Sequence, residues 1–119
     1  MSGLTFYGLA SCDSCRKARK WLDANGIDYR YHDVRADGLD AATVRHWLSA
    51  NDWQTVVNRR STTWRSISDT EREAMDADTA VAAILEQPTL AKRPVLVGDG
   101  FVEIGFDASR YSELIGEAR

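Results

Sequence analysis

One stretch, Thr5–Leu22, constrains the fold more than any other part of the sequence. It begins with an apolar, β-favouring run that ends at Gly8, which predicts a short strand. The next apolar residues are spaced as on one face of a helix: Ala18, Trp21, Leu22 and, further on, Ile27. We expect this helix to end at Asn25 and Gly26, because both residues favour helix C-termini. The stretch therefore predicts a strand, a turn of small residues and an amphipathic helix.

Two cysteines, Cys12 and Cys15, lie at or just inside the N-terminus of this helix. Unpaired backbone N–H groups and the helix dipole favour an anion there, so the pKa of a thiol should fall. Arg16 follows Cys12 by four residues and is expected over the same turn, where it would add a cation. Cys12 is therefore predicted to be a reactive thiol rather than a small buried hydrophobic residue. Cys15 falls on the apolar face and suits either a shielded resolving cysteine or a packing residue.

The composition is that of an ordinary globular domain. The chain has 119 residues, 44% of them hydrophobic and 28% charged, which is enough for one core. Its net charge of -3 gives no general attraction to nucleic acid or to an anionic membrane. No secretory leader and no apolar run of about 20 residues is recognisable, so a cytoplasmic location is expected. Thiols are kept reduced there, and a Cys-x-x-Cys pair is then catalytic, redox-sensing or metal-binding.

The remaining elements are predicted from periodicity and turn residues. They are a strand over 27–34, a helix capped by Asp40, helices starting at Ser68 and over 78–87, strands over 95–97 and 101–104, and a helix over 108–115. Asp99-Gly100 predicts a tight hairpin turn between the last two strands. This order predicts an α/β fold of the thioredoxin type, with a four-stranded mixed sheet. One domain is expected, with a core of about 1–34 and 88–119 and a helical insertion of about 35–87.

Metal binding and serine-type hydrolysis are the competing kinds of chemistry. A structural zinc site needs four ligands, and the chain offers two cysteines. His32 lies in a predicted strand and His46 on a predicted helix, where ordinary polar or packed histidines are expected. No nucleophile turn of a serine hydrolase is present. We therefore predict no metal site.

Arginines form the candidate anion-binding groups, because guanidinium matches the planar geometry of oxyanions. Arg59, Arg60 and Arg65 lie in a polar, basic stretch over 58–65 that shows little periodicity. For Arg59 and Arg65 a solvated loop is an equal alternative. Arg93 is better placed, because it precedes Pro94 and an X-Pro bond disfavours helix and can be cis.

Five short motifs follow one another along nearly the whole chain: Tyr7–Ala18, Ile27–Asp33, Asp37–Asp40, Asn58–Arg65 and Lys92–Val95. Together they resemble the arsenate reductase (ArsC)/Spx family, most closely its YffB-like branch. The resemblance implies a thioredoxin-like fold with a helical insertion. It also implies Cys12 as the nucleophile and a cis bond at Pro94, beside Arg93.

In arsenate reductases of this family, the cysteine attacks arsenate, and glutathione with glutaredoxin resolves the adduct. Three arginines hold the oxyanion there. The resemblance places Arg60 near the first and Arg93 at the second, whereas Gly105 and Phe106 stand where the third is expected. Gly8 replaces a histidine that assists the cysteine.

The YffB-like branch implies a glutathione-dependent thiol reductase, usually with one cysteine at this turn, so Cys15 is a departure from it. We predict a thiol-disulfide reductase that is a monomer with no bound cofactor. Its expected catalytic residues are Cys12, Cys15 and Arg16, and its expected substrate-binding residues are Arg60, Arg93 and Pro94. Glutathione is the expected co-substrate and glutaredoxin a possible partner. The Cys-x-x-Cys-Arg pattern instead matches Spx, a redox-sensing regulator that binds the RNA polymerase α subunit. A genuine arsenate reductase and a domain with an idle thiol are the remaining alternatives.

Overall fold

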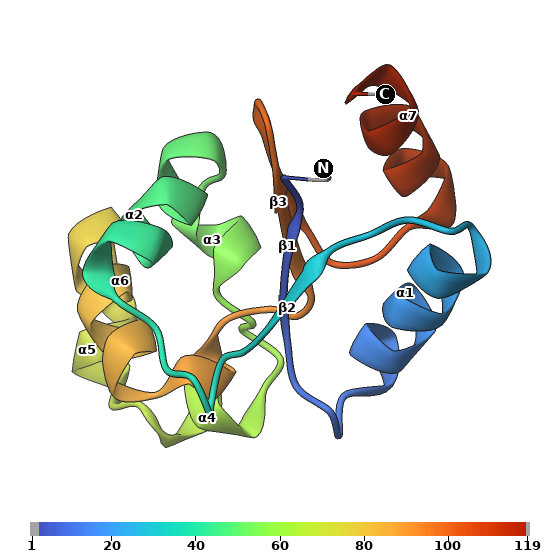
Figure 1. Cartoon of the computed structure of the whole chain (residues 1–119). Helices are drawn as coiled ribbons and strands as arrows, with labels where there is room; N and C mark the ends of the chain where they lie inside the picture. The colour runs from blue at the N-terminus through green and yellow to red at the C-terminus, as the bar shows by residue number, and fades with distance from the viewer. Residues whose placement is uncertain (1–2, 119) are drawn as a thin grey trace. The chain divides into compact units, whose positions relative to one another are not determined.

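The computed structural model describes residues 3–118, which form two compact units (Figure 1). The first unit comprises Met1–Asp33 and Arg93–Arg119, and the second Val34–Lys92. The first contains β1 (Thr5–Gly8), α1 (Asp13–Ala24), β2 (Arg30–Asp33), β3 (Val95–Gly98), β4 (Phe101–Ile104) and α7 (Ala108–Ala118). The second contains α2 (Ala41–Ala50), α3 (Trp53–Val56), α4 (Thr62–Ser66), α5 (Asp69–Glu73), α6 (Ala77–Glu86) and the 3-10 turn η1 (Pro88–Leu90).

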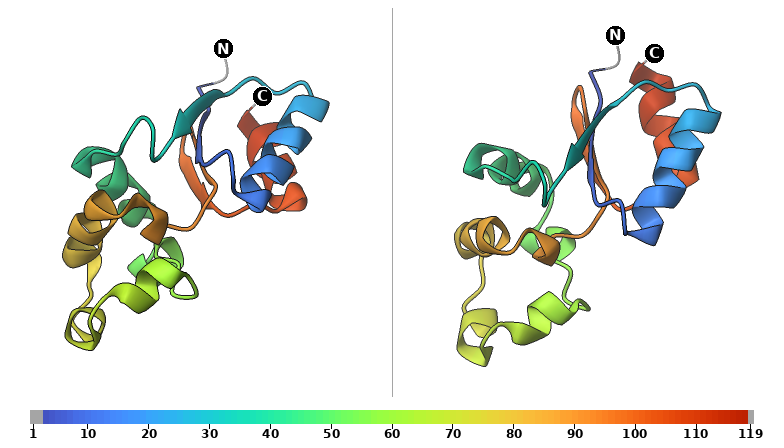
Figure 2. Two further views of the ribbon diagram at one scale, coloured as in Figure 1. Left: turned by 90° about the horizontal axis from the view of Figure 1, so that it is seen from below. Right: turned by 60° about the horizontal axis from the view of Figure 1, so that its bottom comes forward.

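The first unit is built on a four-stranded sheet in the order β2-β1-β3-β4 (Figure 2). β1 and β2 are parallel because α1 carries the chain back between them, while β1–β3 and β3–β4 are antiparallel. Gly98 pairs with Phe101, so Asp99 and Gly100 make a two-residue turn, with Gly100 at φ +85°. These pairings confirm the predicted mixed sheet and hairpin of a thioredoxin-like fold.

One face of this sheet carries the core of the first unit. Figures 1 and 2 show α1 and α7 on this face, and buried side chains of β1 and β3 belong to one cluster with those of the two helices. The buried cluster comprises Leu4, Phe6, Cys15, Ala18, Leu22, Leu96, Tyr111 and Ile115. Cys15 is thus part of the core, which fixes the first turn of α1 against β1.

The second strand is shorter than predicted. It was expected over 27–34 and is observed over Arg30–Asp33. The reason is the end of α1, where Gly26 adopts φ +65° and the Ile27 N–H donates to the Leu22 carbonyl at 3.0 Å. This hydrogen bond satisfies a terminal carbonyl of α1. Ile27 therefore belongs to the helix end, and the strand starts after it.

The second unit is helical, and its helices begin where the sequence supplies capping side chains. α2 contacts α3 and α6, and η1 contacts α4 and α6. The Asp40 carboxylate accepts the Thr43 N–H at 2.8 Å and caps α2, as predicted. Ser68 caps α5 in the same way. α6 starts one residue earlier than expected, because Asp76 and Thr79 form a reciprocal capping box.

Two short helices of this unit, α3 and α4, lie where no element was predicted. The basic stretch contains α4, whose N-cap Ser61 accepts the Trp64 N–H at 3.1 Å. At five residues, α4 is too short to show apolar periodicity, so only its capping serine marks it in the sequence. The Trp64 ring lies against Trp53 of α3, with centroids 6.3 Å apart.

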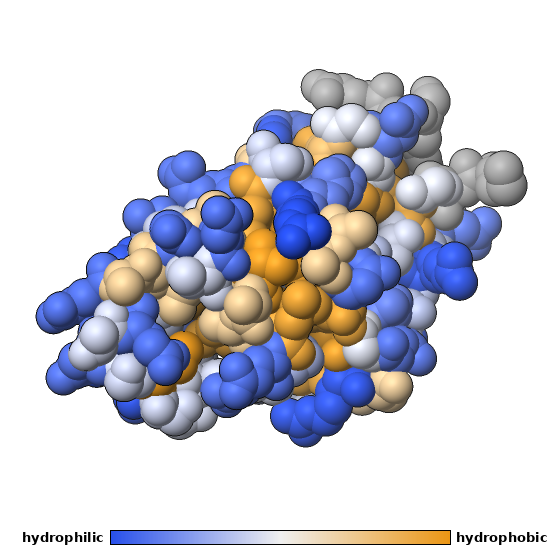
Figure 3. All heavy atoms as spheres, turned by 90° about the vertical axis from the view of Figure 1, so that its left-hand side faces the viewer, coloured by the Kyte–Doolittle hydropathy of each residue, from blue (hydrophilic) through white to orange (hydrophobic). Residues whose placement is uncertain are grey.

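Polar residues dominate the face of the molecule drawn in Figure 3, and hydrophobic residues are visible between them. None of the helices in the described part of the chain combines the length and apolarity that crossing a membrane requires.

Candidate active site

Cys12 is the N-cap residue of α1. The turn after β1 is closed by the Cys12 N–H, which donates to the Leu9 carbonyl at 3.2 Å. The Cys12 backbone is extended, at φ -85° and ψ 122°, and its carbonyl accepts the first helical bond from the Arg16 N–H at 3.0 Å. An N-cap side chain lies over the free N–H groups of the first turn. The half-buried Cys12 thiol therefore occupies the predicted anion-favouring position.

The surroundings of Cys12 favour its thiolate. Burial raises the pKa of this thiol, but the backbone N–H and the thiol of Cys15 lower it, and so does the Arg93 guanidinium. The net result is a pKa below the ordinary value for cysteine. Because the thiolate is the nucleophilic form, this shift increases the fraction of Cys12 that can react.

Cys15 has the opposite character, although it lies only three residues further along. Its side chain is 0% exposed and packs in the core of the first unit. Burial raises the pKa of Cys15 to about 12, and the neighbouring Cys12 adds to the increase. Cys15 is therefore a neutral thiol while Cys12 is reduced.

Arg16, which is predicted to act on Cys12, has another partner in the structure, and its catalytic role stays a prediction. Its guanidinium pairs with the Asp13 carboxylate three residues earlier, at an exposed site. The cation that lowers the pKa of Cys12 is instead Arg93, from the segment before β3. A carboxylate at the first helical position competes for Arg16 because side chains three residues apart face each other on a helix.

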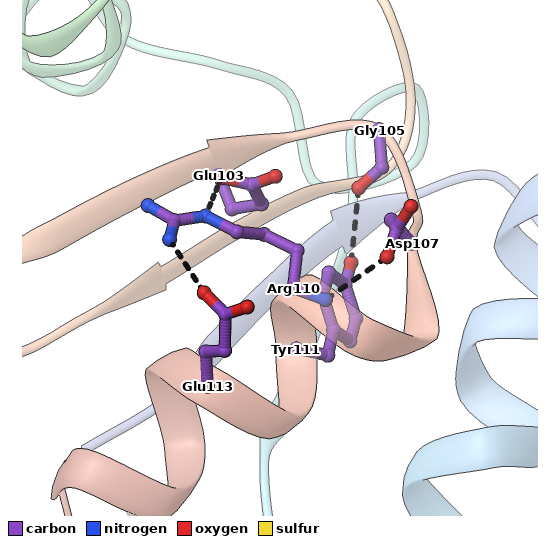
Figure 4. A network of polar contacts seen from close by, with 6 residues as sticks. All are labelled: Glu103, Gly105, Asp107, Arg110, Tyr111 and Glu113. Atoms are coloured by element: carbon purple, nitrogen blue, oxygen red, sulfur yellow. Dashed lines mark hydrogen bonds and ion pairs between the residues drawn. The ribbon is translucent and has the colours of Figure 1, made fainter.

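Arg93 and Pro94 lie at the entrance to β3, and the peptide bond between them is cis. The Pro94 carbonyl accepts the Gly105 N–H at 2.7 Å, and the Gly105 carbonyl accepts the Tyr111 hydroxyl at 3.2 Å (Figure 4). Buried Tyr111 is thereby linked to the segment that carries Arg93. This link was not predicted from the sequence, because periodicity places Tyr111 in a helix over 108–115 but does not indicate a partner for its hydroxyl.

No arginine occupies the position after β4 where arsenate reductases of the family place their third. Gly105 stands there with φ +85°. The nearest arginine downstream, Arg110, contacts Glu103 at 3.5 Å and Glu113 at 3.2 Å (Figure 4). Two carboxylates thus engage Arg110, which makes it a poor substitute for an oxyanion ligand.

The other predicted residues lie apart from this helix end in the sequence. Arg60 belongs to the second unit, where its side chain is exposed and its N–H donates to the Asn58 side chain at 3.1 Å. Its expected role in substrate binding stays a prediction. His32 lies against the Tyr7 ring, with centroids 4.8 Å apart, and His46 is exposed on α2. Among residues 3–118, no three His, Cys, Asp or Glu side chains gather as a metal site would need.

The fold and this helix end define a thioredoxin-like protein with a cysteine pair at its active turn. The model of the ArsC family matches residues 7–114, and the chain belongs to that family.

Three known proteins illustrate the range of that family. The solved structure of the YFFB protein is 37% identical, with a TM-score of 0.90, and the match covers 94% of this chain and 98% of that one. An arsenate reductase (ArsC) related protein from Brucella melitensis is 42% identical, with a TM-score of 0.75 and coverage of 95% and 93%. Global transcriptional regulator Spx 2 from Bacillus anthracis is 26% identical over 87% of this chain and 80% of the regulator. Related chains thus carry both reductase and regulator names.

Proposed function

We propose that this protein is a thiol-disulfide reductase in which Cys12 is the nucleophile and Cys15 resolves the intermediate. The observation that carries the proposal is the opposite direction of two pKa shifts within one helical turn. The pKa of Cys12 lies below its ordinary value, while burial raises that of Cys15 to about 12. A reductase needs this difference, because one thiol must attack first while the other waits.

In the first step the Cys12 thiolate attacks a disulfide of the substrate. A Cys12–S–S–R bond forms, the substrate S–S bond breaks, and the second half of the substrate leaves as a thiolate. The helix N-terminus and Arg93 stabilise the attacking thiolate. Attack therefore starts from the Cys12 side of the turn, whichever disulfide is bound.

In the second step Cys15 becomes the nucleophile. The Cys12 thiolate is one of the groups that raise the pKa of Cys15, and a mixed disulfide at Cys12 removes that charge. The pKa of Cys15 then falls, although its burial still raises it. As the Cys15 sulfur displaces RS⁻ from Cys12, its proton passes to the leaving thiolate. The product is a Cys12–Cys15 disulfide, so the first step itself activates the second.

We propose glutathione as the reductant that closes the cycle. Two molecules of glutathione reduce the Cys12–Cys15 disulfide to two thiols and leave as oxidised glutathione, with glutaredoxin as a possible carrier. The net reaction is RSSR plus two reduced glutathione molecules, giving two RSH and oxidised glutathione. Arg93 is a suitable partner for a glutathione carboxylate, because it is half-buried beside the thiol that reacts.

A redox-sensing regulator is the second candidate, favoured by the Cys12-x-x-Cys15 pair and by the relatives named as Spx regulators. Under that function, one oxidation of the pair changes binding of a partner, RNA polymerase in the Spx comparison. Arsenate reduction is less favoured, because glycine stands where the third arginine is expected.

The experiment that separates these functions counts turnovers. The protein is incubated with hydroxyethyl disulfide, glutathione, glutathione reductase and NADPH, and the NADPH consumed is compared with the protein present. If the protein is a reductase, we expect it to consume many equivalents of NADPH per protein molecule. NADPH consumption no greater than in the protein-free reaction, with a stable Cys12–Cys15 disulfide as product, would favour the regulator, because one oxidation of the pair by hydroxyethyl disulfide uses no glutathione. The same assay with arsenate as oxidant tests the third function.

A further inference from the structure

Gly8, the last residue of β1, lies against the first turn of α1. Leu4 and Phe6 precede it at alternate positions and both belong to the core cluster on the α1 side of the sheet. Gly8 continues this series, so a side chain at this position would point toward α1. The closest neighbours of such a side chain belong to Cys15 and Phe6.

A methyl group at Gly8 has no room. Its Cβ would lie 2.9 Å from the Cys15 Sγ, 3.4 Å from the Cys15 Cβ and 2.9 Å from the Phe6 Cε1. Carbon and sulfur are in van der Waals contact only at clearly longer distances. The Cys15 sulfur thus occupies the space that any other residue at position 8 would fill.

Backbone conformation gives no separate reason for a glycine here. The glycines with positive φ among the described residues are at positions 3, 26, 38, 100 and 105, and Gly8 is not one of them. Other residues adopt the backbone of Gly8 without strain. The absent side chain is therefore explained by the space that the Cys15 sulfur and the Phe6 ring occupy.

The present position of that sulfur is the one that engages Cys12, since the Cys15 thiol is among the groups acting on Cys12. Its surroundings leave little choice of another position, because Cys15 is 0% exposed and packed among Ala18, Leu22 and Tyr111. We infer that Gly8 is a positioning residue for the second cysteine: by leaving space for the Cys15 sulfur, it sets the rate at which Cys15 displaces a thiol from Cys12. This inference rests on the proposed function, in which Cys15 resolves the intermediate.

The affected step is a single thiol-disulfide exchange. Cys12–S–SG and Cys15–SH give the Cys12–Cys15 disulfide, GS⁻ and a proton. A displacement of about 1 Å in a reacting group can slow such a step by about 100-fold. We therefore expect Gly8→Ala to slow it by roughly 10- to 100-fold, while attack of Cys12 on oxidised glutathione changes less than about threefold.

The test follows both steps in one experiment. Reduced protein is mixed with oxidised glutathione, and mass spectrometry of acid-quenched samples records the mixed disulfide and its conversion to the internal disulfide. Gly98→Ala is the matched control, because its Cβ would crowd Phe101 and Leu4 in a strand of the same sheet without meeting Cys15. Equal slowing in both variants, or no slowing in Gly8→Ala, would overturn the inference.

A second pair of variants covers the case in which Gly8→Ala does not fold. Phe6→Leu removes the ring that crowds position 8, so Phe6→Leu is compared with Phe6→Leu/Gly8→Ala, which retains the contact with Cys15. Slower conversion in the double variant supports the inference, and equal conversion overturns it. If wild-type protein forms the mixed disulfide and turns over without the internal disulfide, the inference fails and a reductase resolved by glutathione remains. If no mixed disulfide forms, the reductase function fails as well.

Discussion

Cys12 and Cys15 occupy the same turn of α1, yet the two sites are opposites. Cys12 lies at the cap, half-buried, with backbone N–H groups and Arg93 acting on it. Cys15 lies three residues further along, fully buried behind β1, where burial is the main cause of its raised pKa. The chemical identity of a cysteine therefore does not determine its role. Three residues of helix separate a site that stabilises a thiolate from one that suppresses it.

Removing each sulfur in turn is the strongest test of this contrast. Cys12→Ser should lower disulfide turnover by about 1,000-fold or more, because it removes the covalent nucleophile. Cys15→Ser should retain a larger share of the wild-type turnover than Cys12→Ser, since a second glutathione can resolve the intermediate. Turnover is measured by the NADPH-coupled assay. Equal losses in the two variants would show that the cysteines do not have separate roles.

The source of the Cys12 effect is tested by exchanging arginines. Arg93→Met should raise the pKa of Cys12 and slow its alkylation by iodoacetamide at pH 7 roughly severalfold, because less thiolate is present. Arg16→Met is the matched control: its guanidinium pairs with Asp13, so alkylation should change little. If Arg16→Met has the larger effect, the helix-face cation predicted from the sequence acts on Cys12 after all.

The burial of Cys15 predicts that the folded protein loses stability at high pH. Its pKa is about 12 in the folded protein and near 9 when unfolded, so the unfolded state loses its proton first. Stability from this group is complete below pH 9 and falls between pH 9 and 12, by at most about 1.4 kcal/mol per pH unit. Urea unfolding of wild type and Cys15→Ala at pH 8, 9 and 10 measures the difference. Parallel pH profiles would contradict a buried, neutral Cys15.

The smallest expected effect concerns the link between the core and the Arg93 segment. Tyr111→Phe removes the hydroxyl that donates to Gly105 and should cost about 1 kcal/mol of unfolding free energy. Tyr29→Phe is the control, because its hydroxyl bonds to Arg19 and Asp23 nearer the surface. Urea unfolding gives both values. A slower Cys12 alkylation in Tyr111→Phe alone would extend this link to the reactive thiol.

Local signals in the sequence predicted much of the fold. Gly8, Asn25-Gly26 and Asp99-Gly100 mark ends and turns through conformational preferences that neighbouring residues do not override. The five-residue α4 was missed because a single capping serine is a weak signal without apolar periodicity. The late start of β2 was missed because the Ile27 N–H bonds to the Leu22 carbonyl at the end of α1 instead of joining the strand.

The candidate site was predictable only where it depends on local sequence. The cap position of Cys12 follows from the strand-to-helix turn, and burial of Cys15 follows from its place on the apolar face. The arginine acting on Cys12 depends instead on which side chains tertiary structure brings together. Asp13 engages Arg16, and the entrance to β3 supplies Arg93 from about 80 residues away in the chain.

The crowding at Gly8 also limits how sequences of this kind can diverge. A histidine at this position, as in the arsenate reductases that the chain resembles, is sterically incompatible with a buried sulfur at position 15. The substitutions at positions 8 and 15 must therefore occur in a fixed order. Residue 15 has to become smaller, and the Phe6 ring has to move, before residue 8 can acquire a side chain, because the reverse order passes through an overcrowded intermediate. A site with two cysteines can thus change into a site with one cysteine and an assisting histidine only if the substitution at position 15 comes before the one at position 8.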